Sequence, residues 1–139
     1  MPADPGATEL SDAALVAAFE TCTLPPAAFG HRAHLRVAWI YLREGGVAHA
    51  VLRFREHLRR FAAAHGAHDR YHETMTWGWI LLVHDRMQRL GGHHSFEELL
   101  GASPDLLDAA ALRRYYHDAT LASPLARRVF LLPDRLADA

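Results

Sequence analysis

The chain has 139 residues, of which half are hydrophobic and 22% are charged, a composition typical of a globular domain and not of a disordered protein. The chain has 15 basic residues, all of them arginines, and 16 acidic residues, which gives a net charge of -1. This balance lacks the basic surface that attracts nucleic acid. No stretch approaches the ~18 apolar residues of a membrane span, and the start of the chain lacks the features of a secretion signal. We therefore expect a cytoplasmic protein with neither nucleic acid nor membrane as partner.

The residue types favour helices over strands. The chain contains 25 alanines and 20 leucines, with few isoleucines and threonines, and this mixture has high helix propensity. It has no Asn-Gly or Asp-Gly hairpin signal and no sustained alternation of apolar and polar residues. The sequence therefore predicts an all-α protein.

The apolar pattern divides the chain into a tail and a single helical domain. Residues 1–10 have two prolines, a glycine and no periodicity, so we expect a flexible tail there. In the domain over 11–139, apolar residues recur three and four positions apart, and Gly or Pro follows each run. These runs predict four principal helices, at 11–22, 31–44, 47–65 and 71–90. Short connections make neighbouring helices antiparallel, which predicts an up-down helical bundle of about four main helices.

Serines mark the starts of additional short C-terminal helices. Ser95 and Glu98 have the spacing of a capping box, and Ser103 and Ser123 each precede a proline. Within the helix over 71–90, Gly78 lies between two tryptophans. A glycine inside a helix costs about 1 kcal/mol relative to alanine, so Gly78 indicates the close approach of a neighbouring helix or of a ligand, and packing by a helix is the favoured cause. The single Cys22 is expected to be a small buried residue.

The most unusual feature of the composition is its 11 histidines. Four of them continue apolar stripes at helical spacing: His31, His34, His65 and His72. In an antiparallel bundle these four positions fall at the same end, so we expect their side chains to converge. Others are expected in solvent, because they lie off the apolar seam or in a glycine-rich turn: His49, His57, His93 and His94.

Converging imidazoles are typical of a transition-metal site. Neutral imidazole binds Zn, Fe, Cu and Ni, and such sites in bundles use side chains from facing helices. The sequence therefore predicts a metal site of His31, His34, His65 and His72, with the metal not decided. Glu73 could complete a set of two histidines and one carboxylate for Fe(II), or act as general base beside a zinc-bound water. Tyr71 is a candidate for proton transfer. Glu73 is turned by about 100° from His72 around the helix, so its direction is open.

Two functions follow from this pattern. The first is a metal-dependent enzyme, a hydrolase or an oxygenase acting on a small molecule. The alternative is a non-catalytic helical ligand-binding or protein-interaction module, in which the same histidines are buried and hydrogen-bonded. A third arrangement, in which His31 and His72 relay protons without a metal, is also an enzyme hypothesis. The sequence has no Walker loop, Gly-x-Gly-x-x-Gly turn, His-Glu-x-x-His pair or paired Cys-x-x-Cys.

Overall fold

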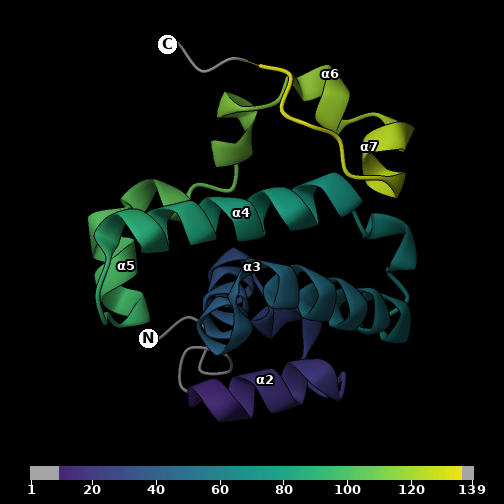
Figure 1. The fold of residues 1–139 in the computed structure, drawn as a ribbon. Coiled ribbons are helices and arrows are strands. Elements are labelled where there is room, and N and C mark those ends of the chain that lie inside the picture. Colours follow the sequence, from purple (N-terminus) through teal and green to yellow (C-terminus); the bar gives the residue numbers. More distant parts are fainter. Residues whose placement is uncertain (1–9, 136–139) are drawn as a thin grey trace. The chain divides into compact units, whose positions relative to one another are not determined.

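The computed structural model describes residues 10–135, and every regular element in that range is a helix (Figure 1). The all-α prediction is confirmed. The chain forms two compact units, an N-terminal unit (Met1–Tyr71) and a C-terminal unit (His72–Ala139), which are described separately. The predicted tail over 1–10 lies outside the described residues except for Leu10. The antiparallel order of all four principal helices stays a prediction. Across the described range, no helix is both long and apolar enough to cross a membrane.

In the N-terminal unit, α2 (Asp12–Glu20) is defined by its caps. Ser11 accepts a hydrogen bond from the N–H of Ala14 at 3.1 Å, as its position before the apolar run predicts. After Glu20 the chain turns sharply, and Cys22 adopts a φ of 62°. This left-handed conformation is the one in which glycine ends many helices, and it costs other residues roughly 1–2 kcal/mol. Cys22 is also partly exposed, and not buried as expected.

The conformation of Cys22 leads to a stability prediction. Replacing Cys22 by glycine should raise the free energy of unfolding by about 0.5–1 kcal/mol, because relief of the left-handed strain exceeds the entropy cost of glycine in the unfolded chain. Urea denaturation at pH 7 measures the change. Cys22→Ala is the control, since it removes the thiol and keeps the Cβ. A gain in stability with alanine, or none with glycine, would contradict the prediction.

The helix α3 (His31–Ala64) contains the predicted interruption, as a kink at Gly46 with φ 83° and ψ -172°. The rings of His34 and Phe54 lie on opposite sides of the kink, with centroids 5.4 Å apart. In a straight helix these residues would be about 30 Å apart. The halves 31–45 and 47–64 therefore fold back on each other as an antiparallel hairpin. Only glycine adopts the φ of Gly46 readily.

A cluster of phenyl rings joins α2 to both halves of α3. Phe19 of α2 lies 4.6 Å from Phe29 and 5.5 Å from Phe61, measured between ring centroids. Phe29 follows a short 3-10 helix, η1 (Pro26–Ala28), and is 5.1 Å from Phe61. Such aromatic contacts are favourable beyond the apolar area that they bury. The cluster holds the end of α2 beside the start and the end of α3. A second 3-10 helix, η2 (His68–Arg70), follows α3.

The C-terminal unit is built around α4 (Glu73–Leu90). The helix α5 (Phe96–Ala102) has the predicted capping box, in which Ser95 and Glu98 each accept from the other's backbone N–H. The short helix α7 is capped by Ser123, also as predicted. The other elements are short: η3 (Pro104–Leu107), η4 (Ala111–Arg114), α6 (Asp118–Leu121) and α7 (Pro124–Arg128).

Gly78 allows a neighbouring side chain to approach the backbone of α4 closely, as its place inside a helix predicted. A Cβ atom at position 78 would lie 3.2 and 3.3 Å from the two methyl carbons of Leu112, which belongs to η4 and is buried. These distances are tighter than most side-chain contacts in folded proteins. Leu112 therefore packs directly on the backbone of α4.

This contact predicts that the effect of alanine at position 78 changes sign with the residue at 112. Gly78→Ala should lower the free energy of unfolding by about 1 kcal/mol, because overpacking outweighs the gain in helix propensity. In a Leu112→Ala background the same change should raise it by about 1 kcal/mol. A double-mutant cycle by chemical denaturation measures the coupling. Additive effects would show that Leu112 does not restrict position 78.

Candidate functional site

His72, a predicted metal ligand, is buried and caps the start of α4. Its Nδ1 accepts a hydrogen bond from the N–H of Met75 at 3.0 Å. Its Nε2 lies 2.7 Å from the carbonyl oxygen of Leu121. A carbonyl only accepts, so these partners assign the proton to Nε2 and leave Nδ1 as the acceptor. Both ring nitrogens of His72 are thus used in bonds to the backbone.

The predicted catalytic residues lie on either side of His72. Glu73 is the first residue of α4, with 8% of its surface exposed. The Nε1–H of Trp77 donates to its Oε2 at 3.2 Å. A carboxylate in the first turn of a helix is also favoured by the helix dipole. Tyr71 belongs to the N-terminal unit, where the guanidinium of Arg59 lies 5.6 Å from its ring centroid.

His31 and His34 lie in the first turn of α3, as predicted. The ring of His34 is 4.4 Å from that of Phe29 and 5.4 Å from that of Phe54. Burial among these groups, with a smaller contribution from the charge of the neighbouring His31, lowers the pKa of His34 to about 4. His34 is therefore neutral at pH 7.

His65 differs from its predicted orientation. The sequence places it on the core face at the end of the helix over 47–65, but α3 ends at Ala64 and His65 is exposed. Its ring lies 4.5 Å from that of Phe61. The helical spacing stops being informative at the C-cap, because the backbone there leaves the helix. The expectation of a core-facing His65 is wrong.

The convergence of the four histidines stays a prediction, because His72 belongs to the C-terminal unit and the other three to the N-terminal unit. Within residues 10–135, no group of three or more His, Cys, Asp and Glu side chains is arranged to hold a metal ion. The zinc, iron, copper or nickel site is therefore an expectation from the sequence.

Two of the histidines expected in solvent are largely enclosed. His57 has a side chain only 15% exposed, with its Nε2 3.7 Å from Glu20 Oε2. Both ring nitrogens of His94 are buried and have no hydrogen-bond partner in the described part of the chain. The expectation was wrong for these two. His57 is covered from α2, where Glu20 and the ring of Phe19 lie beside it. His93 is exposed, as expected, and His49 is 38% exposed.

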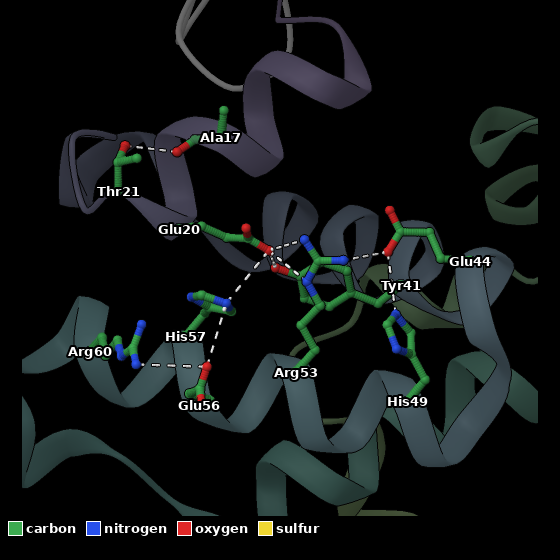
Figure 2. A network of polar contacts seen from close by, with 10 residues as sticks. All are labelled: Ala17, Glu20, Thr21, Tyr41, Glu44, His49, Arg53, Glu56, His57 and Arg60. Carbon is green, nitrogen blue, oxygen red and sulfur yellow. Dashed lines mark hydrogen bonds and ion pairs between the residues drawn. The ribbon is translucent and has the colours of Figure 1, made fainter.

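A polar network that the sequence did not reveal joins α2 to both halves of α3 (Figure 2). The Oε2 atom of Glu20 accepts from the hydroxyl of Tyr41 at 2.5 Å and from Nε of Arg53 at 2.8 Å. Nη1 of Arg53 donates to Oε1 of Glu44, also at 2.8 Å. The guanidinium of Arg53 lies over the ring of Tyr41, 4.8 Å from its centroid. Glu20 thus accepts from donors on both halves of the hairpin.

The pKa shifts of Tyr41 and Arg53 hold each of these two groups in one protonation state. Tyr41 is fully buried, and burial together with its bond to Glu20 raises the pKa of its hydroxyl above the ordinary value. Burial alone would lower the pKa of Arg53, but the charges of Glu20 and other neighbours outweigh it and raise that pKa. Tyr41 therefore stays protonated and Arg53 stays charged near pH 7. These groups are fully engaged with one another, which favours a structural role over proton transfer.

Few features of the amino-acid sequence indicate this network. Arg53 and His57 are one helical turn apart among charged residues, a pattern typical of a solvated face. Glu20 is a single acidic residue at the end of α2, and Tyr41 lies within an apolar run. Their meeting depends on the kink at Gly46, which brings position 53 back beside position 41.

Comparisons with protein-family models, with curated proteins and with solved structures found no match for this chain.

Proposed function

We propose that the protein is a helical binding or interaction module in which the histidines predicted to bind a metal have structural roles. The observation that supports this proposal is the pair of hydrogen bonds of His72. Its Nδ1 lone pair is used by Met75 and its Nε2–H is directed to Leu121. A metal ligand needs a free lone pair on one ring nitrogen, so ligation would require breaking one of these bonds.

A contact surface for such a module is offered by apolar side chains at the C-terminal end. Leu125 and Val129 are one helical turn apart and are 46% and 39% exposed, and Leu132 is 77% exposed. Arg128, which is exposed, lies in the same stretch. Neighbouring exposed apolar residues are typical of interaction sites. We propose a protein partner with an apolar surface and an acidic edge, and a cytoplasmic location.

A metal-dependent enzyme is the second candidate. The observation that favours it is the low pKa of His34, since the neutral imidazole is the form that binds metals. His31 lies one helical turn earlier, a spacing at which two histidines can bind one ion. In this proposal Glu73 and Tyr71 would transfer protons, and the substrate would be a small molecule.

Calorimetric titration of the full chain, purified without a His tag, separates the two proposals. We expect no Zn(II), Fe(II), Cu(II) or Ni(II) binding tighter than about 10 μM at pH 7, where histidine ligands are mostly deprotonated. Tighter binding that is lost in His34→Ala and in His72→Asn would overturn the module proposal. Asparagine is the informative replacement at 72 because its side chain also caps helices, so the variant separates a capping role from a ligand role.

A photo-crosslinking residue at position 132 tests the contact surface directly. We expect it to crosslink a single recurrent partner in cells, and Leu125→Asp to abolish that product. The same residue at the exposed Gln88 of α4 is the control. Equal labelling from positions 132 and 88, or labelling unaffected by Leu125→Asp, would overturn the proposed surface.

A further inference from the structure

After α7 the chain continues without a regular element over residues 129–135, here called the C-terminal strap. In Figure 1 this segment is yellow and runs from α7 back past α6. Among residues 10–135, no strand pairs with the strap. Individual side chains and carbonyl groups of α4, α6 and the chain between η4 and α6 hold it in place.

The strongest attachment of the strap is to Thr74 in the first turn of α4. Thr74 is fully buried, and its hydroxyl donates to the carbonyl of Val129 at 2.8 Å. The Oγ1 atom of Thr74 also accepts a hydrogen bond from the N–H of Leu131 at 3.1 Å. A carbonyl and an N–H two residues apart point to the same side of an extended chain, so Thr74 takes the place of a neighbouring strand. The hydroxyl of Tyr116 donates to the carbonyl of Leu131 at 2.7 Å.

The strap also covers the aromatic residue that contacts Glu73. The ring of Phe130 stacks on Trp77, with centroids 4.9 Å apart and planes 23° apart. Trp77 in turn donates its indole N–H to Glu73. A path of direct contacts therefore runs from the strap to a buried carboxylate.

The far end of the strap is fixed by two further residues. The carboxylate of Asp134 accepts from the N–H of His117 at 2.9 Å and from the hydroxyl of Thr120. The N–H of Arg135 donates to the carbonyl of Tyr115 at 3.0 Å. These bonds lie at the start of α6, away from Thr74 in the sequence.

We propose that the C-terminal strap is a lid that opens as one unit from α4, exposing Trp77, the hydrogen-bond donor to Glu73, while the rest of the C-terminal unit stays folded. The strap is held mainly by individual hydrogen bonds, which bury little apolar surface. Its residues Val129 and Leu132 are already exposed to solvent. Segments with few buried apolar contacts open at lower free energy than helices in a core. The proposal does not depend on the module or enzyme function.

Amide hydrogen exchange of the full chain, measured residue by residue by NMR, tests this lid. Thr74→Val removes both strap bonds of residue 74 with little change in shape. We expect exchange of the strap-linked amides of His117 and Arg135 to accelerate by about thirtyfold, although neither bonds to Thr74. The amides of Ile80 and Val83 in α4 should keep their rates.

Thr76→Val is the matched control. Thr76 is buried on the same helix, but its hydroxyl donates to the carbonyl of His72 and makes no strap bond. It should leave exchange at positions 117 and 135 unchanged. Acceleration at Leu131 alone in Thr74→Val would show piecemeal loosening and would overturn the lid. Acceleration along α4 in the same variant would indicate general destabilisation and would overturn it too.

A second variant tests the lid without touching a hydrogen bond. Phe130→Ala removes the ring that covers Trp77 and should accelerate exchange at Leu131, His117 and Arg135 together, by about tenfold or more. It should also increase the oxidation rate of Trp77 by N-bromosuccinimide, identified by mass spectrometry. Unchanged exchange and unchanged oxidation would show that the strap does not open as a unit over Trp77.

Discussion

Replacing Glu20 by alanine is expected to lower the free energy of unfolding by about 3 kcal/mol. The substitution leaves the hydroxyl of the fully buried Tyr41 without its acceptor and removes one of the two carboxylates bound to Arg53. A buried polar group without a partner costs about 1–3 kcal/mol, and more when a charged group is involved. Glu20 also ties α2 to both halves of α3, so its loss should loosen the whole N-terminal unit.

Guanidinium denaturation at pH 7 measures this effect, and Glu56→Ala is the matched control. Glu56 is 58% exposed, and its ion pair with Arg60 is 3.8 Å long. Pairs of this kind contribute little, so the control should change stability by less than about 1 kcal/mol. Tyr41→Phe in the Glu20→Ala background should recover part of the loss, because the unpaired hydroxyl is then absent. Equal effects of the Glu20 and Glu56 substitutions would contradict the structural role of the network.

The second large effect is a loss of stability in acid caused by His34. Its pKa is about 4 in the folded protein and about 6.5 in an unfolded chain. The unfolded state therefore binds the proton more tightly, and the contribution of His34 to stability is complete above pH 6.5. It falls as pH decreases from about 6.5 to about 4 and changes no further below that. At about 1.4 kcal/mol per pH unit, a pKa difference of about 2.5 units gives a total loss of about 3.5 kcal/mol.

The difference between the wild type and His34→Phe isolates this effect from other titrating groups. Phenylalanine keeps a ring beside Phe29 and Phe54 but does not titrate. Denaturation curves collected between pH 7 and pH 4 should show a steeper loss of stability for the wild type. NMR of the imidazole should give a titration midpoint near pH 4 for His34. Parallel stability curves, or a midpoint near 6.5, would show that the ring is solvated.

The sequence predicted the elements whose signals are local. The spacing of apolar residues three and four positions apart predicted α2, α3 and α4. Ser11, Ser95 and Ser123 cap helices where their positions predicted. The break at residues 45–46 was also predicted, because glycine alone reaches a positive φ without strain. Gly78 correctly indicated a close neighbour, although not which residue supplies it.

The candidate site could be predicted only in part. His34 and His72 are enclosed as the apolar stripes indicated, but His65 is exposed because α3 ends one residue before it. The sequence contained no information on the partners of His72, since Leu121 is 49 residues away along the chain. Whether an inward histidine binds a metal or caps a helix depends on those partners.

The amino-acid sequence by itself determined the all-α class, the approximate extents of the main helices, the caps at Ser11, Ser95 and Ser123, and the break at Gly46. These depend on backbone conformation and on neighbours within about four residues, which the sequence specifies directly. The tertiary structure decided the Glu20 network, the hydrogen bonds of His72 and the attachment of the strap to Thr74. The bonds Glu20–Tyr41, His72–Leu121 and Thr74–Val129 join residues 21, 49 and 55 positions apart, and such pairs meet only after packing has fixed how the helices and the strap lie against one another.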